Sequence, residues 1–155
     1  MKRCTVITFL LLVAVLTFAQ EVKRPKMWGI AKITFLISDF DVAREYYGRF
    51  LGFEEAFSYD SNLGKIISFK VNDRQFLEFT EDKDAKNKPR LVSWSIETEE
   101  VEKMRLYLKQ NGVKVPGKIK IDGAGNEVFL VYDNSGVPLE FINLTSNSLH
   151  RKSKG

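Results

Sequence analysis

The chain has 155 residues, 44% of them hydrophobic and twelve of them phenylalanine, so it is long and apolar enough for one packed domain. Its 24 Lys and Arg residues nearly balance 20 Asp and Glu residues, for a formal net charge of +4. That balance excludes a strongly basic nucleic-acid-binding protein, and the single cysteine excludes an internal disulfide.

The first nineteen residues have the pattern of an export signal. Lys2 and Arg3 form a basic start, an apolar run covers 6–18, and a small-x-small cleavage site ends at Ala19. An uncleaved membrane anchor is the alternative, which the short apolar run disfavours. We therefore expect a signal peptide at 1–19 and a periplasmic or secreted protein without a membrane attachment.

Cleavage would change the charge and the redox chemistry of the chain. Removing Lys2 and Arg3 reduces the 24 basic residues to 22, against 20 acidic ones. Removing Cys4 leaves no thiol for catalysis or for a thiolate metal site.

A polar segment at 20–28 is interpreted as a flexible lead, and residues 29–80 then predict a strand, a helix and three strands. Gly29–Ile37 alternates and is rich in β-branched residues. Ser38 or Asp39 can cap the helix, which ends at Gly52 in a left-handed conformation. Its predicted buried stripe is Ala43, Tyr46, Tyr47, Phe50 and Leu51. The following strands are predicted at 53–59, 65–71 and 75–80.

The same order of elements returns in residues 91–144, after a charged linker at 81–90. A strand at 91–97 leads to a helix capped by Thr98, with Val101, Met104 and Leu108 on its inner face. Strands are predicted at 115–121, 127–132 and 138–144. The polar, basic tail at 145–155 is expected to fray.

The two halves align with a spacing of about sixty residues, which indicates a duplicated module. Lys32 corresponds to Ser93, and Glu78 corresponds to Glu140. The turn at 122–126, which contains Gly123-Ala124-Gly125, is interpreted as a hairpin turn that can act as a lip over a cleft between the halves.

The opening of the first module, Ile33-Thr34-Phe35-Leu36-Ile37-Ser38-Asp39 with Tyr46-Tyr47 and Leu51-Gly52-Phe53, resembles a vicinal oxygen chelate module. The strand Gly136-Val137-Pro138-Leu139-Glu140-Phe141 resembles the closing strand of such a module. This superfamily includes glyoxalase I, extradiol dioxygenases, methylmalonyl-CoA epimerase and the bleomycin-resistance proteins. The resemblance covers 29–144 and implies an α+β fold, in which two tandem βαβββ modules form one curved mixed sheet around a cleft, with the helices outside.

The resemblance also implies a place for a divalent metal in that cleft. Metal-dependent members use a His or Gln on the first strand of each module and a Glu on the last. The matching positions here are Lys32, Glu78, Ser93 and Glu140, so both glutamates fit the pattern and both histidine positions depart from it.

Strand alternation leads independently to the same inner face, because the apolar set of each strand faces its helix. Val92 and Trp94 belong to that helix-facing set. The opposite set is predicted to hold Lys32, Thr34, Phe76, Glu78, Ser93, Ser95 and Glu140. The aromatic residues that best fit a cleft lining are Phe57, Tyr59, Phe76 and Tyr132.

Three interpretations of this face remain open. Lys32 takes the place of the metal and pairs with Glu78, Glu140 or both. Alternatively, these are ordinary solvated residues, or the two glutamates hold Mg²⁺ or Mn²⁺ with water. The only histidine, His150, lies in the tail, and a catalytic zinc or iron site normally needs imidazole.

Two functions follow from these interpretations. The first is a metal-free binding protein, similar to the bleomycin-resistance branch, that holds a small organic molecule. The second is a glyoxalase I-like lyase, an isomerase or a dioxygenase-type enzyme, with Glu140 or Glu78 as the catalytic base and a divalent metal as a possible cofactor. The resemblance also implies a homodimer, and a module without any ligand is a third possibility.

Overall fold

The computed structural model describes residues 22–82 and 90–153. The predicted signal peptide at 1–19 lies outside these residues, as does most of the predicted linker. Among the described residues, no helix is long and apolar enough to cross a membrane.

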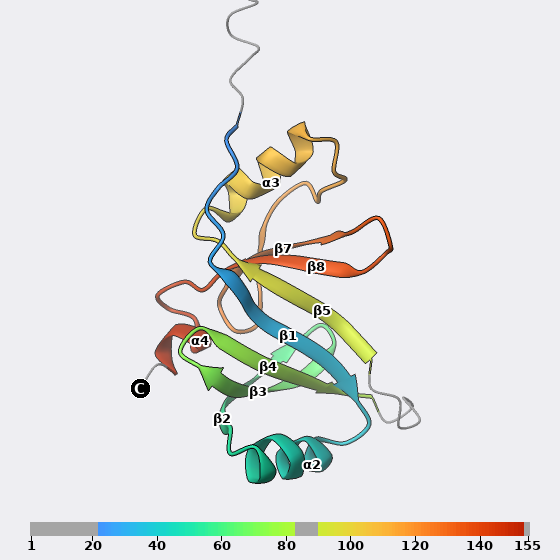
Figure 1. Cartoon of the computed structure of the whole chain (residues 1–155), viewed down its shortest axis with the longest axis vertical. Coiled ribbons are helices and arrows are strands. Elements are labelled where there is room, and N and C mark those ends of the chain that lie inside the picture. The colour runs from blue at the N-terminus through green and yellow to red at the C-terminus, as the bar shows by residue number, and fades with distance from the viewer. Residues whose placement is uncertain (1–21, 83–89, 154–155) are drawn as a thin grey trace, which may run out of the picture.

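Eight strands form one curved mixed sheet in the order β2-β3-β4-β1-β5-β8-β7-β6 (Figure 1). The central strands β1 and β5 are antiparallel, and each is parallel to the last long strand of its own module, β4 or β8. The strands are β1 (Gly29–Ile37), β2 (Glu54–Ser61), β3 (Gly64–Asn72), β4 (Gln75–Glu81), β5 (Arg90–Glu97), β6 (Lys120–Ile121), β7 (Glu127–Tyr132) and β8 (Pro138–Asn143). The predicted α+β fold of two βαβββ modules is confirmed.

The strand register places the two inner glutamates at equivalent positions of the two modules. Glu78 on β4 lies beside Thr34 on β1, and Glu140 on β8 lies beside Ser95 on β5. Since β1 and β5 are also neighbours, both glutamates come to the middle of the sheet.

The first helix consists of α2 (Phe40–Ala43) and a π-helical segment, η1 (Arg44–Phe50). The side chain of Asp39 caps it by accepting a hydrogen bond from the Asp41 N–H at 2.7 Å. The helix ends before Gly52, which has the predicted left-handed conformation with φ of 72°.

Only part of the stripe predicted for this helix is buried. Ala43 is 3% exposed, whereas Tyr46, Phe50 and Leu51 are between 48% and 65% exposed. The hydrogen bond from Leu51 N to Tyr46 O, at 3.1 Å, is of the i→i−5 kind found in a π-helix. The wider turn moves the later residues off the face that a period of 3.6 predicts.

The second helix, α3 (Val101–Gln110), buries Val101 and Met104 as predicted. Its N-cap residue is Glu100 rather than Thr98, whose hydroxyl accepts from Glu100 N at 3.4 Å. The strand predicted at 115–121 is reduced to β6 because Pro116 and Gly117 interrupt it.

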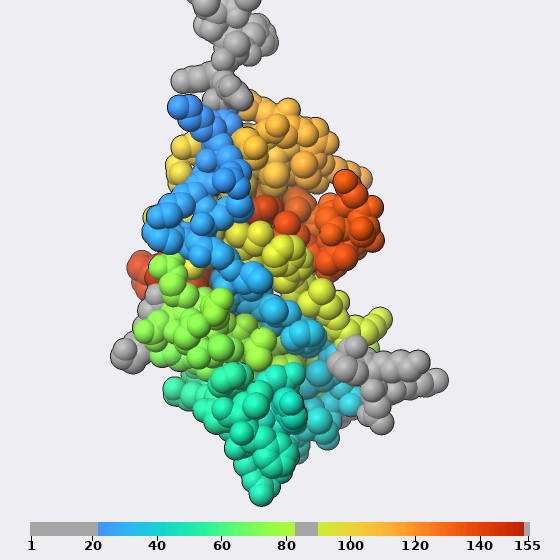
Figure 2. All heavy atoms as spheres, in the orientation of Figure 1, coloured from blue at the N-terminus to red at the C-terminus, as the bar shows by residue number. Residues whose placement is uncertain are grey.

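Both ends of the described chain contact the folded body. The predicted fraying of the tail is wrong, whereas the flexibility predicted for the lead at 20–28 stays a prediction. Val22 N donates to Gln110 Oε1 at 3.0 Å, and Met27 packs into the core beneath α3. Figure 2 shows the blue N-terminal segment lying against this part of the molecule. The tail forms a short helix, α4 (Leu149–Lys152), which Ser148 caps and which covers the concave side of the first module.

Candidate functional site

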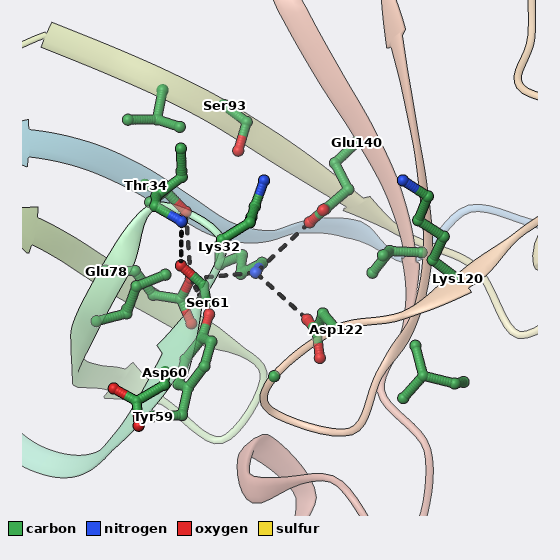
Figure 3. A pocket seen from close by; sticks show the side chains of 17 residues that line it. Lys32, Thr34, Tyr59, Asp60, Ser61, Glu78, Ser93, Lys120, Asp122 and Glu140 are labelled. Carbon is green, nitrogen blue, oxygen red and sulfur yellow. Dashed lines mark hydrogen bonds and ion pairs between the residues drawn. The ribbon is translucent and has the colours of Figure 1, made fainter.

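A buried lysine lies in the middle of the concave face. Lys32 on β1 is 5% exposed, and its Nζ lies 3.1 Å from Glu78 Oε2 and 3.5 Å from Glu140 Oε1 (Figure 3). A third carboxylate oxygen, Asp122 Oδ2, lies 3.7 Å from the same nitrogen. The structure therefore contains both ion pairs predicted for Lys32. Sequence reasoning missed the third because Asp122 carries only a turn signal.

Both oxygens of Glu78 accept hydrogen bonds, and its side chain is completely buried. Its Oε2 accepts from Lys32, from Thr34 Oγ1 at 3.2 Å and from Tyr59 OH at 2.9 Å. Its Oε1 is 3.0 Å from His150 Nε2. Since both oxygens are engaged and neither is exposed, Glu78 has no accessible oxygen for a ligand.

His150 closes a ring of polar contacts around this glutamate. Asn126 Nδ2 lies 3.1 Å from His150 Nδ1 and 2.8 Å from Asp122 Oδ2. Because an amide nitrogen only donates, His150 Nδ1 accepts and Nε2 carries the hydrogen that Glu78 accepts. The ring runs from Lys32 through Glu78, His150, Asn126 and Asp122 back to Lys32.

The sequence prediction missed His150 because the residue lies in a tail that was expected to fray. Its imidazole packs edge-on against Phe57 and Phe76, with both ring centroids at 4.8 Å. Phe76, a predicted ligand-binding residue, is thus covered by α4 and does not line the cleft. The only feature of the sequence that indicates a helix here is Ser148, a good N-cap residue two positions before His150.

Glu140 and Ser93 remain open to the cleft. Ser95 Oγ donates to Glu140 Oε1 at 2.7 Å, so Ser95 supports this carboxylate and does not face a ligand. The side chain of Glu140 is 15% exposed, and its Oε2 has no hydrogen-bond donor among residues 22–82 and 90–153. Ser93 lines both hollows of the cleft, and its hydroxyl forms no hydrogen bond with another residue of 22–82 and 90–153. These two groups can bind a ligand directly.

The cleft consists of two adjoining hollows of about 450 and 500 Å³, which share Ser93, Lys120 and Glu140 as lining residues. The predicted cleft residues Thr34 and Tyr59 line the first hollow, and Tyr132 lines the second.

Two local irregularities of the backbone shape this cleft. Val92 was predicted to face the helix, but it lines the cleft because the β1–β5 register shifts between Thr34 and Phe35. The turn at 122–126 forms one wall of the cleft. A Cβ on Gly123 would clash with the backbone oxygen of Asp60, so only glycine allows this contact.

Burial and charge set the protonation of the cluster. Burial by itself raises the pKa of the Glu78 carboxyl, but the Lys32 ammonium and the His150 hydrogen bond outweigh it and lower the pKa to about 2. Burial opposes the charge of Lys32, yet Glu140 and Glu78 raise its pKa well above the ordinary value. Burial and Glu78 raise the pKa of the Tyr59 hydroxyl, which keeps it a hydrogen-bond donor.

The residues present do not fit the divalent metal that the resemblance implies. The Lys32 ammonium lies between the two glutamates, Glu78 already accepts from four donors, and His150 Nε2 is itself a donor. In the described part of the chain, no group of three or more ligating side chains is placed to hold a metal ion.

A sequence model of the Glyoxalase/Bleomycin resistance protein/Dioxygenase superfamily matches residues 29–141. The chain belongs to this superfamily. The comparison with curated proteins found no significant match.

Solved structures with the same fold include methylmalonyl-CoA epimerases. The enzyme from Mycobacterium tuberculosis is 15% identical, with a TM-score of 0.65 over 83% of this chain and 93% of its own. A complex of methylmalonyl-CoA epimerase with methylmalonyl-CoA and NH₄⁺ is 18% identical, with a TM-score of 0.67 over 79% and 99%. A Streptomyces coelicolor epimerase variant with 2-nitronate-propionyl-CoA is 18% identical, with a TM-score of 0.65 over 76% and 98%.

Proposed function

We propose that this chain binds a small organic molecule in its central cleft without a metal, and that the Lys32 ammonium takes the place of the metal. The observation that carries the proposal is the position of Lys32 Nζ, within 3.1 to 3.7 Å of three carboxylates. A fixed ammonium supplies one positive charge and three N–H donors, so it can order the carboxylates around it.

The lining of the cleft supports a ligand of mixed polarity. Leu63, Ile66 and Val128 provide apolar walls, and Ser93 and Glu140 provide hydrogen-bonding groups. Ligand pockets commonly combine apolar walls with a few polar groups that fix orientation.

A screen of small molecules by thermal shift, followed by calorimetry, tests this proposal. Ser93 lines both hollows of the cleft, so Ser93→Leu should weaken binding at least tenfold. Ser58→Leu, at an exposed position of β2, is the matched control. Ligands that bind both variants equally well would place the site elsewhere.

The second candidate is a metal-free enzyme in which Glu140 acts as general base. Its Oε2 faces the cleft while Oε1 is held by Ser95 and lies near Lys32. A base next to an ammonium can remove a proton alpha to a carbonyl while the ammonium stabilises the oxyanion that develops. Glu78 is the weaker choice, because its four hydrogen bonds leave it no free oxygen.

Proton exchange with solvent tests this second function. Methylmalonyl-CoA is the first compound to try, because it is named in a similar structure. We would follow loss of its alpha proton in D₂O by NMR, with Glu140→Gln as the inactive variant. Exchange that survives this substitution would exclude Glu140 as the base.

Export and dimerisation belong to the same proposal. The pattern of residues 1–19 supports export, which predicts a mature N-terminus at Gln20 by mass spectrometry.

The exposed apolar side chains Val42, Tyr46 and Phe50 on the first helix support a homodimer, because such patches often mark interfaces. Sedimentation of Phe50→Ser, compared with the unmodified protein, tests this contact.

A further inference from the structure

The charges of the cleft differ between its inner end and its mouth. At the inner end, the single ammonium of Lys32 faces three carboxylates, so that cluster keeps a formal charge of minus two. Asp60 adds a further carboxylate to the lining. At the mouth lie two exposed lysines, Lys118 and Lys120. Figure 3 shows Asp60 and Lys120 on opposite sides of the Lys32 cluster.

The inner end favours a ligand that carries positive charge. A partly buried carboxylate is costly unless a cation or several donors compensate it. Of the three carboxylates around Lys32, Glu78 is completely buried with both oxygens hydrogen-bonded, and Asp122 Oδ2 already accepts from Asn126. Among these three carboxylates, only Glu140 has an oxygen, Oε2, that accepts from no donor in residues 22–82 and 90–153, and Ser93 lies beside it in the lining.

The mouth favours the opposite charge. Lys118 and Lys120 form no ion pair with an acidic residue in the described part of the chain. Both ammonium groups are thus available to a ligand anion, and a cleft with walls of one sign attracts the opposite sign.

We propose that the ligand is a small zwitterion of the amino-acid type, with its ammonium group at Glu140 and Ser93 and its carboxylate at Lys118 and Lys120. This inference rests on the proposed binding function, whose ligand class it specifies. The α4 segment restricts the ligand to this side, because it covers Glu78 and Phe76.

Two sets of probe molecules test whether the ligand needs both a free ammonium group and a free carboxylate. The first is the common α-amino acids, each with its N-acetyl and its amide derivative. The second is the unbranched ω-amino acids from glycine to 6-aminohexanoate, which vary the distance between the two charges. Calorimetry on the purified full-length protein should find at least one free amino acid that binds about tenfold or more tightly than both of its capped forms.

Variants assign each end of the ligand. The double substitution Lys118→Met with Lys120→Met should abolish the preference for the free carboxylate over the amide. Glu140→Gln should reduce the preference for the free amine over the N-acetyl form. Lys109→Met, at an exposed lysine of α3 that does not line the cleft, should change neither preference.

Capped and free forms that bind equally, or no binding of any free amino acid at millimolar concentration, would overturn this inference. A neutral or purely anionic molecule that binds and is sensitive to Ser93→Leu would also overturn it, while leaving the proposed binding function intact. If the broad screen finds no molecule whose binding depends on Ser93, both the proposed binding function and the proposed ligand class are wrong.

Discussion

At the scale of single residues, the feature that distinguishes this site is a lysine where the family pattern has a metal ligand. An ammonium carries one charge instead of two and cannot dissociate from the chain. Its burial is costly, so Lys32 is stable there only because Glu78, Glu140 and Asp122 surround it. Conversely, Glu78 stays ionised at full burial only because donors surround it.

Replacing the lysine should therefore destabilise the fold strongly. Lys32→Met leaves buried carboxylates without their cation, and we expect a loss of about 3–5 kcal/mol in the free energy of unfolding. Urea denaturation measures this loss, and Lys32→Met combined with Glu78→Gln should recover part of it. A loss below about 1 kcal/mol would mean that the buried ion pairs of Lys32 contribute little net stability.

Because the pKa of Glu78 is lowered in the folded state, the free energy of unfolding should fall at acid pH. Burial raises this pKa, but Lys32 and His150 lower it from 4.5 to about 2 in the folded state. The contribution of Glu78 is then complete above about pH 4.5 and is lost as the pH falls towards 2, to the extent of roughly 3 kcal/mol. Unfolding measured at pH 6 and pH 3 should show a smaller difference for Glu78→Gln than for the unmodified protein. The control is Glu45→Gln, on the exposed face of the first helix, which should keep the full difference.

At the scale of elements, the C-terminal segment shows where local sequence rules fail. Four helical residues cannot be stable alone, and a polar, basic tail gives no apolar period. The order of α4 comes from tertiary contacts: Leu149 N donates to Ala124 O at 2.9 Å, and Arg151 Nε donates to Leu144 O at 2.7 Å.

His150 should be the residue on which this segment depends. His150→Ala would leave Glu78 Oε1 without its donor and open a cavity between Phe57 and Phe76, at a cost of about 2–4 kcal/mol. Lys152→Ala, on the exposed side of the same helix, should change the unfolding free energy by less than about 0.5 kcal/mol. Equal effects of the two substitutions in thermal or urea unfolding would show that α4 is held without the histidine.

For the first helix, the sequence rules predict the ends correctly but not the buried face. Its cap at Asp39 and its stop at Gly52 follow from residue types, so sequence rules locate its ends. Its buried face depends on the helical period, and the π-helical turns change that period. The exposed Phe50 and Leu51 are the result.

At the scale of the whole molecule, the duplication predicted two modules with the same order of elements, and the resemblance predicted that they form one curved sheet. Strand alternation then predicted part of the site. Alternation along four strands placed Lys32, Glu78, Ser93 and Glu140 on one face, and the structure has them there. Asp122 and His150 could not be placed, because their positions depend on how a loop and a tail pack across the sheet. His150 lies 72 positions from Glu78 in the sequence, and no local pattern connects them.

The tail also breaks the symmetry of the duplicated modules. It closes the concave side of the first module over Glu78, while the second module keeps Glu140 and Ser93 accessible. The equivalent strands β4 and β8 therefore differ in how accessible their glutamates are to a ligand. Both modules line the cleft, but of the two equivalent glutamates only Glu140 keeps an exposed fraction.

The centre of the cleft should bind a divalent metal once the lysine is replaced by a histidine. Lys32→His would replace a cation by a neutral nitrogen ligand and leave the carboxylates of Glu78, Glu140 and Asp122 around it. We expect this variant to bind Zn²⁺ or Ni²⁺ at least tenfold more tightly than the unmodified protein, as measured by calorimetry. Lys120→His places an imidazole at the mouth of the same cleft and controls for weak surface binding. Equal affinities in all three proteins would mean that the hydrogen bonds of Glu78, rather than the charge of Lys32, keep metals out.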